Sequence, residues 1–317
     1  MKKLFLASLL LLTSCSNATP VVILAPSATH LPPPTSAPTA GPTSTVEASV
    51  PTQTAIPPTE ANPNLRVSPV DGMPQVYIPA GTFHMGGFDV RRAPDEVPVH
   101  DVTLHAFWMD QLEVTNAMYA LCVSAGACDL PQKLSSQRRF EYYGITEFND
   151  YPAVNVTWGQ AKTFCEWAQE RLPTEAEWER AARGGDMRTF PWGEDKPDGR
   201  FANFNMLVTD TSRVGSYALG ASPFGVLDMA GNAAEWTNDF YKFNYYETSE
   251  LTNPTGPATS SSLNRVVKGG SLGDAEINIR VSKRSSVRGS NLKAVPGTDS
   301  YLGEFSPRIG FRCVVSE

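Results

Sequence analysis

The segment from Asp228 to Trp236, DMAGNAAEW, combines acidic side chains with a glycine turn. Asp228 and Glu235 lie on either side of Gly231-Asn232, residue types that favour tight turns. A tight turn can direct backbone carbonyls inward, and carbonyls together with carboxylates form the oxygen-rich shell that Ca²⁺ prefers. The segment therefore predicts a calcium site. A solvated or internally hydrogen-bonded turn without an ion is the alternative.

Histidine offers little support for a further metal site. Outside the N-terminal region the histidines are His84, His100 and His105, and they form no HxH or HExxH motif. His100 and His105 are five residues apart in a segment that alternates like a strand, which places them on opposite faces. A histidine metal triad is therefore not expected.

The N-terminal residues have the pattern of a secretion signal. Lys2 and Lys3 precede an apolar stretch from Leu4 to Leu12, which is shorter than the roughly 20 residues that span a bilayer. The following residues, up to Cys15, resemble a bacterial lipobox. We expect residues 1–14 to be a signal peptide and Cys15 to carry lipid, so that the protein is exported and anchored to the cell membrane or outer membrane. A secreted protein with an unmodified Cys15, or a retained N-terminal anchor, is the alternative.

Residues 15–66 are expected to form a disordered tether. From Ser16 to Leu65 the chain has eleven prolines, nine threonines and no Phe, Trp or Tyr, a composition that cannot bury a core. The aromatic residues are concentrated in residues 67–317, which are long enough for one large domain. The formal net charge of −7 becomes −9 once the signal lysines are removed, so nucleic acid is not an expected partner.

Cysteines form the second group of reactive side chains. Cys122, Cys128, Cys165 and Cys313 are an even number in a chain that is expected to reach an oxidising compartment. Disulfides are therefore expected, with three possible pairings, and four free buried thiols are the alternative. Cys122 and Cys128 are close enough in sequence to form a small local loop.

Local patterns predict the elements that must position these side chains. Capping residues start three helices, at Thr115 (to about Ala125), at Thr157 with Gln160, and at Thr174 with Glu177 (to Arg183). Alternation predicts two short strands around a turn in Val76–Met85, and single strands in His100–Met109, Asn264–Lys268, Ile277–Ser282 and Ile309–Val315. Glycine, proline and asparagine recur from residue 193 to 262 and predict loops. The fold class is thus α+β, irregular and loop-rich.

Several ordered blocks give the chain a family resemblance. They are GTFHMG (81–86), EVTN (113–116), NVTW (155–158), RLPTEAEWERAARGG (171–185), PWG (191–193), GNAAEW (231–236), KGGS (268–271) and GFRC (310–313). In this order they resemble the formylglycine-generating enzyme, or sulfatase-modifying factor, family. The resemblance implies a single irregular α+β domain related to C-type lectin-like folds.

The resemblance also implies particular pairs and ligands. It pairs Cys165 with Cys313, which leaves Cys122 with Cys128. The family's calcium turn corresponds here to Asp228, Gly231, Ala233 and Glu235. A second family calcium site would use Asn203, Phe204 and, as the nearest aspartate, Asp210, in a loop that looks shortened.

The main departure from the family concerns catalysis. Formylglycine-generating enzymes hold Cu(I) with two cysteines shortly after GGS, because thiolates suit that soft ion. The stretch from Leu272 to Asn278 contains no cysteine, so we expect neither copper nor oxidase activity.

A non-catalytic binding or accessory module is therefore expected. Its loops between Gly269 and Gly303 would contact a peptide, a glycan or an envelope protein. Arg280, Arg284 and Arg308 are candidates to line a polar cleft there, although solvated surface arginines would give the same sequence. A formylglycine-generating oxidoreductase acting on a sulfatase cysteine by another route, and a structural envelope protein, are the alternatives.

Overall fold

The computed structural model describes residues 63–290 and 303–317. The predicted signal peptide, Cys15, most of the predicted tether and part of the loop region between Gly269 and Gly303 lie outside these residues. The described residues belong to one unit, Pro58–Glu317. Within them, none of the helices is both long and apolar enough to cross a membrane.

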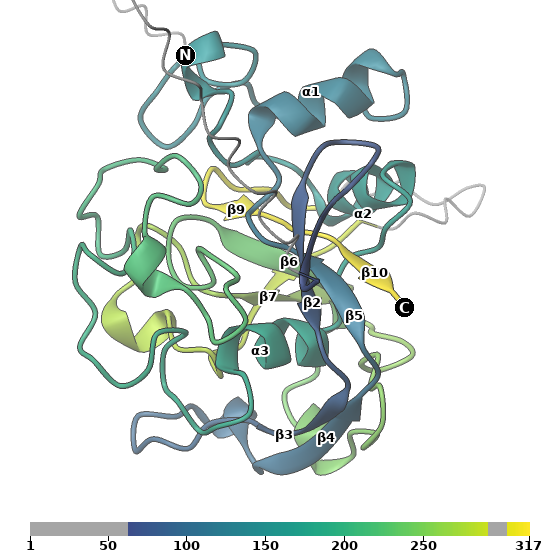
Figure 1. The fold of residues 1–317 in the computed structure, drawn as a ribbon, viewed down its shortest axis with the longest axis vertical. Helices are drawn as coiled ribbons and strands as arrows, with labels where there is room; N and C mark the ends of the chain where they lie inside the picture. The colour runs from purple at the N-terminus through teal and green to yellow at the C-terminus, as the bar shows by residue number, and fades with distance from the viewer. Residues whose placement is uncertain (1–62, 291–302) are drawn as a thin grey trace, which may run out of the picture. The chain divides into compact units, whose positions relative to one another are not determined.

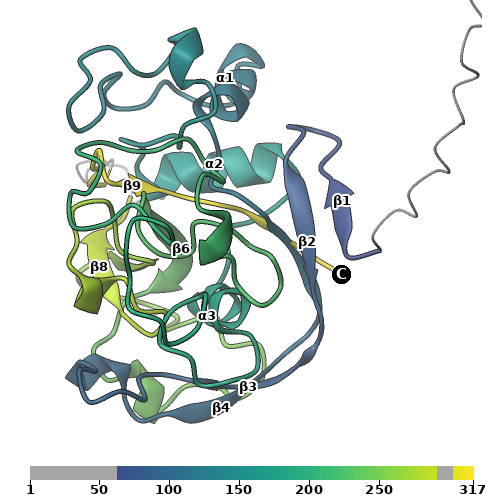
Figure 2. The ribbon, with the colours of Figure 1, turned by 60° about the vertical axis from the view of Figure 1, so that its left-hand side comes forward.

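The described strands form three sheets (Figure 1). One has the order β1 (Leu65–Val67), β2 (Pro74–Ile78), β5 (Phe107–Asp110), β10 (Val314–Ser316), with antiparallel pairing throughout. A second joins β3 (Gly81–Met85) to β4 (His100–Leu104). The third has the order β8 (Ser285–Arg288), β7 (Asn264–Lys268), β6 (Ala234–Phe240), β9 (Ile309–Gly310), and β9 runs parallel to β6. Figure 2 shows β1 beside β2 at the outside of the domain.

Three α-helices connect and cover the sheets: α1 (Asn116–Ser124), α2 (Trp158–Trp167) and α3 (Glu175–Arg183). The predicted caps are all present, and both Thr157 with Gln160 and Thr174 with Glu177 form complete capping boxes. Helix α3 packs against β3, β6 and β7 in the middle of the domain (Figure 1). Short 3-10 helices cover Pro94–Glu96, Thr146–Phe148, Ala218–Gly220, Tyr245–Glu247 and Glu276–Asn278.

Two large apolar clusters form most of the core. One contains Trp158, Phe164 and Trp236, together with the Cys165–Cys313 disulfide. The other surrounds Trp178 of α3. These clusters place α2 and α3 on opposite sides of the segment that leads into β6.

Both disulfides are present as the resemblance implied. Cys122–Cys128 closes a short loop at the end of α1, and Cys165–Cys313 links residues 148 apart in the sequence. By the loop-entropy estimate, a link of that length stabilises the fold by about 5 kcal/mol. The long disulfide therefore holds the C-terminal strand against α2.

Some of the predicted elements were wrong. His100–Met109 is two strands, because the chain leaves one sheet after Leu104 and enters another at Phe107. Ile277–Ser282 is not a strand, since it starts in a 3-10 turn and Ile279, Arg280 and Val281 are all buried.

Two boundaries also needed correction, and two further strands were missed. Ile309–Val315 is interrupted between β9 and β10. Leu65 and Arg66, assigned to the tether, pair with β2 in β1. Strand β6, which follows the predicted calcium turn, and strand β8 were not predicted. The fold class, α+β and loop-rich, was predicted correctly.

Candidate functional site

The predicted calcium turn is a tight backbone bend that leads into β6. Asp228, Gly231 and Asn232 have positive φ angles of 56°, 78° and 52°. A Cβ on Gly231 would lie 2.3 Å from the carbonyl oxygen of Asn203, so glycine is required at this position. The Asn232 amide donates to that same oxygen at 2.7 Å. The turn is thus held against the loop that carries the second predicted site.

The two carboxylates of the turn have different partners. Asp228 is buried, and its Oδ2 accepts a hydrogen bond from the Gly215 amide at 2.6 Å. Glu235 is fully buried, and both of its oxygens are bonded: Arg312 donates to each at 2.7 Å, and Trp178 Nε1 donates to Oε2 at 2.7 Å. Asp228 is therefore the more available ligand.

Glu113 is a third buried acid at the turn, and it was not among the predicted site residues. Its oxygens accept hydrogen bonds from Asn232 Nδ2 at 2.7 Å and from the Ala233 amide at 2.9 Å. Glu113 belongs to the EVTN block, where the sequence analysis used only Thr115 as a helix cap. An acidic residue beside apolar Val114 at a helix start was the available signal.

The charges at the turn do not balance. Burial raises the pKa of Asp228 to about 6, and burial together with Asp228 and Glu235 raises the pKa of Glu113 well above its usual value. The cation that faces these three acids is Arg312. A cation such as Ca²⁺ would reduce this excess of negative charge, and Asp228 is the carboxylate most free to bind it. Glu235 fits less well, because a direct bond to the ion would compete with Arg312.

The second predicted calcium site is not formed in this arrangement. Asp210 Oδ2 accepts hydrogen bonds from Ser136 Oγ at 2.7 Å and from the amides of Arg138 and Arg139 at 2.9 and 3.1 Å. The guanidinium of Arg139 lies 3.4 Å from Oδ1 and would repel a cation. Asn203 Nδ2 donates to the backbone carbonyl of Asp210 at 2.9 Å and not to its carboxylate. Phe204 is buried in an apolar cluster.

In the segment after Gly270, residues of the segment form hydrogen bonds with one another. The amide and hydroxyl of Ser271 donate to Asp274 Oδ2 at 2.8 and 2.6 Å. Leu272 is fully buried, and its amide donates to the Asn232 carbonyl at 2.9 Å, which ties the segment to the calcium turn. Residues 269–273 have the GxSxG spacing of a serine nucleophile, but the Ser271 hydroxyl donates to an aspartate rather than to a histidine.

The predicted arginine cleft was wrong for two of its three residues. Arg280 is fully buried and forms two hydrogen bonds of 2.7 Å with Glu96. Arg284 is also buried and binds both oxygens of Glu175 at 2.7 and 2.9 Å. Both arginines therefore hold the core together and cannot contact a ligand. Arg308 is half-buried and donates to Gln137 at 3.1 Å.

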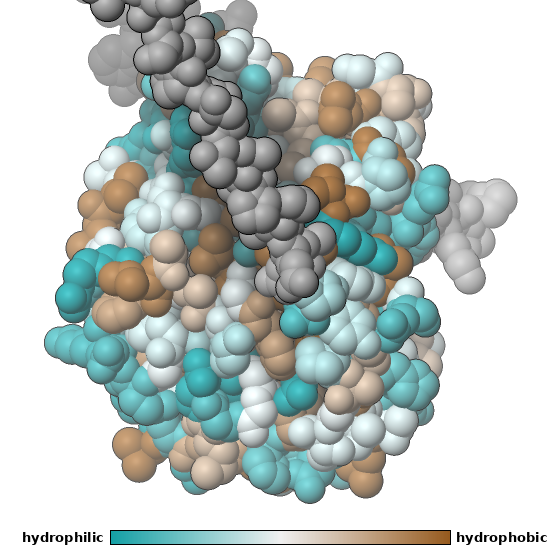
Figure 3. Space-filling model, viewed as in Figure 1, coloured by the Kyte–Doolittle hydropathy of each residue, from teal (hydrophilic) through white to brown (hydrophobic). Residues whose placement is uncertain are grey.

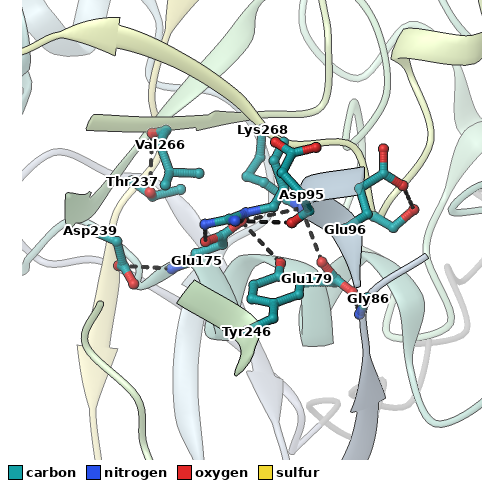
Figure 4. Close-up of polar contacts among 12 residues, drawn as sticks. Gly86, Asp95, Glu96, Glu175, Glu179, Thr237, Asp239, Tyr246, Val266 and Lys268 are labelled. Carbon is teal, nitrogen blue, oxygen red and sulfur yellow. Dashed lines mark hydrogen bonds and ion pairs between the residues drawn. The ribbon is translucent and has the colours of Figure 1, made fainter. Parts of the chain in front are cut away.

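The acidic residues of the RLPTEAEWE block lie in a buried polar network (Figure 4). Glu179 accepts from Lys268 Nζ at 3.0 Å and from the Gly86 amide at 2.8 Å. Glu175 accepts from the Tyr246 hydroxyl at 3.1 Å in addition to Arg284. The side chains converge from α3, β7 and the loop before β4, so this network is part of the structural core.

Two of the surface hollows formed by described residues differ in polarity. A polar one of about 330 Å³ lies beside α3, β6 and β10, and the residues that line it include Arg171, Glu177, Asn238 and Asn253. A more apolar one of about 460 Å³ is lined by residues that include Leu112, Met118 and Leu121 beside α1. Across the face in Figure 3, hydrophobic and hydrophilic residues are interspersed.

Comparison with known proteins gives consistent matches. A family model, the sulfatase-modifying factor enzyme 1-like domain, matches residues 61–317. Formylglycine-generating enzyme from Bos taurus is 34% identical over 258 residues, covering 66% of this chain and 68% of that protein. A protein named serine/threonine-protein kinase pkn1, from Chlamydia pneumoniae, is 36% identical over 251 residues. That match covers 75% of this chain and spans 37% of the length of the Chlamydia protein.

The fold also matches a solved structure. PvdO from Pseudomonas aeruginosa superposes with a TM-score of 0.65 at 26% identity, covering 81% of this chain and 100% of PvdO. The family match extends over the calcium turn, the α3 network and both disulfides. The chain therefore belongs to the family of the sulfatase-modifying factor enzyme 1-like domain.

Proposed function

We propose that this chain is a membrane-anchored binding or accessory module of the cell envelope without formylglycine-generating activity. The observation that carries the proposal is the stretch from Leu272 to Asn278, where the family resemblance places the copper-binding cysteines. The stretch has no cysteine, and the four cysteines of the domain are paired in two disulfides. Soft thiolates are the ligands that Cu(I) chemistry needs, so this chain has none to offer there.

The direct test is conversion of a peptide that contains CxPxR. The full chain is incubated with the peptide, copper and oxygen, and an active formylglycine-generating enzyme is run in parallel. Mass spectrometry is expected to find unchanged cysteine with this chain and aldehyde with the control enzyme. Aldehyde formed at a rate similar to that of the control would establish the oxidoreductase alternative and overturn the proposal.

A search for ligands distinguishes a binding function from a purely structural one. In the proposal, exposed loops of the domain contact a peptide, a glycan or an envelope protein. Envelope extracts passed over the immobilised full chain, and a glycan array, are expected to return a saturable ligand that a heat-unfolded sample does not retain. A chain that binds nothing saturably in either format fits the structural alternative.

Calcium at the Asp228 turn is part of the same proposal. Asp228 is the carboxylate ligand, with the carbonyls of Gly231 and Ala233, and the excess negative charge of Glu113 and Glu235 supports a cation there. Asp228→Ala is the informative change, because it removes the side-chain ligand, which Asp228→Asn would keep as an amide oxygen, whereas Glu235→Ala would also leave Arg312 unpaired and destabilise the fold without any ion. Calcium is expected to raise the melting temperature of the wild type more than that of the variant. Equal shifts would contradict a calcium role for this turn.

The lipid anchor on Cys15 completes the proposal. In a bacterial host, the wild type is expected in the membrane fraction, with an N-terminal peptide that carries the mass of a lipid. Cys15→Ser is expected to release the protein from that fraction. An unmodified Cys15 would contradict the anchor.

A further inference from the structure

A second group of buried acids lies beside the Cys165–Cys313 disulfide, away from the Asp228 turn. Gln75 of β2 and Asp110 of β5 are direct partners in the sheet. The amide of Gln75 donates to Asp110 Oδ1 at 3.0 Å and to Glu170 Oε1 at 2.8 Å. The Cys313 amide donates to Asp110 Oδ2 at 2.8 Å. One neutral side chain thus bridges two carboxylates that come from distant parts of the chain.

The turn between β1 and β2 covers this group with two further oxygen-bearing side chains. Ser68 and Asp71 are 3% and 6% exposed. Asp71 lies close enough to influence the pKa of both Asp110 and Glu170, and Ser68 influences that of Glu170. Ser68 Oγ, Asp71 Oδ2 and Glu170 Oε2 are buried and form no hydrogen bond of ordinary geometry, although the Ser68 side chain lies close enough to Glu170 to lower its pKa as a hydrogen-bond partner. Buried polar atoms are normally satisfied, so these oxygens are available to a ligand.

The charges of this group are also unbalanced. Arg312 is the cation that acts on Asp110, but its guanidinium already binds Glu235. Arg66 approaches only the Gln75 amide oxygen, at 2.8 Å. The three acids of the group therefore have no cation of their own among the described residues.

The spacing suits a single ion. One oxygen each from Asp110 and Glu170 lies within 4.8 Å of the other and of Cys313 Sγ, and the sulfur is already bonded to Cys165. Two oxygens at that separation can both reach one Ca²⁺, whose bonds to oxygen are about 2.3–2.6 Å long. All the available donors are oxygens, which excludes the softer metals that prefer sulfur or nitrogen.

We propose that Asp110 and Glu170 bind a Ca²⁺ ion, with Ser68 and Asp71 beside them, at a site that is separate from the turn at Asp228. The ion would neutralise the three acids and occupy the unpaired oxygens. It would also link the β1–β2 turn, at the N-terminal edge of the domain, to β5 and to the loop after α2. The bound ion would thus hold the first hairpin of the domain, β1 and β2, against the rest of the fold.

The test compares matched variants of the full chain. Glu170→Gln keeps the shape but removes one acid, and Glu166→Gln, an exposed acid of α2 that pairs with Lys162, is the control. Bound ions are counted by calorimetry after chelation, and melting temperatures are measured with chelator and with Ca²⁺. Glu170→Gln is expected to bind one fewer ion per chain than the wild type and to lose part of the Ca²⁺-dependent shift. Glu166→Gln is expected to behave as the wild type does.

A further variant keeps the two calcium sites distinguishable. Asp228→Ala removes the side-chain ligand at the turn and leaves the Glu170 group intact, so the Glu170→Gln deficit is expected to persist in the double variant. An unchanged ion count and an unchanged Ca²⁺ shift in Glu170→Gln would overturn the proposal, whatever Asp228→Ala does. An equal response to Mg²⁺ and Ca²⁺ would overturn the assignment to calcium. If Glu170→Gln does not fold, Asp71→Asn carries the same comparison.

Discussion

Two groups of buried acids, one around α3 and one beside the long disulfide, differ in how their charge is balanced. Around α3, Glu175 is paired with Arg284, and Glu179 with Lys268 and Arg183. Beside the long disulfide, Asp110 and Glu170 share only the neutral amide of Gln75. Burial is complete or nearly complete in both groups. The difference therefore lies in the partners and not in the degree of burial.

The pKa values follow from those partners. Burial by itself would raise the pKa of Glu175, but Arg284 and Lys268 outweigh it and hold that pKa below its usual value. No such partner acts on Glu170, whose pKa rises to about 9. The α3 group is thus complete without a ligand, whereas the disulfide group holds protons until a cation replaces them. The following variants are designed to break or sharpen this contrast.

The largest change in stability is expected when an ion pair of the α3 group is removed. Arg284→Met leaves Glu175 buried without its main partner, so the free energy of unfolding is expected to fall by about 3–5 kcal/mol. Urea denaturation measures the loss. Arg200→Met, which removes an exposed partner of Asp198, is the control and is expected to change little. A similar loss in both variants would show that the burial of the pair is not the cause.

A smaller change, an increase in stability, is expected when a positively charged side chain is placed among the acids beside the long disulfide. Glu170→Lys places an ammonium beside Asp110 and Asp71, and in chelator it is expected to raise the free energy of unfolding by about 1.5–3 kcal/mol, the range for hydrogen bonds to charged groups. The same urea experiment measures the gain. The variant is also expected to lose the Ca²⁺ response. Destabilisation in chelator would contradict an excess of negative charge at this position.

The smallest effect is a change in the dependence of stability on pH. An acid whose pKa is higher in the folded than in the unfolded state binds more protons when folded, so its contribution to stability falls as pH rises. For Glu170 the window runs from its ordinary pKa, near 4.5, to about 9. In chelator, stability is expected to fall across this window, and less steeply in Glu170→Gln. Melting curves at several pH values measure both slopes, and parallel slopes would contradict the assignment.

Local features of the sequence were enough to predict the helices but not the sites. The capping residues Thr157 and Thr174 act within three residues of themselves, so they could be identified without knowledge of the fold. Arg280 was misplaced because its partner, Glu96, is 184 residues away. The partner of Glu170, Gln75, is 95 residues away. Whether a charged residue is buried depends on such distant partners, which periodicity does not reveal.

The change of sheet after Leu104 illustrates the same limit for strands. Continued alternation would bury Ala106 and Trp108 with Val102 and Leu104, but the chain passes there from β4 to β5 and buries Phe107 and Met109 instead. Periodicity therefore does not reveal where a chain changes sheet, because the buried face changes at the same point. The family resemblance, by contrast, identified the disulfide between Cys165 and Cys313, because the order of the blocks carries information about the whole fold.

The long disulfide also determines how the domain responds to a mechanical load. Cys313 directly precedes β10, so tension applied at the C-terminus passes through the disulfide into α2 and bypasses residues 166–312. At about 3.3–3.6 Å per residue, the bypassed chain would otherwise extend by roughly 500 Å. Tension applied at the N-terminus reaches β1 first, a three-residue strand at the edge of its sheet. In a stretched molecule the first hairpin is therefore expected to unfold first, whereas residues 166–312 cannot be extended until the disulfide is reduced.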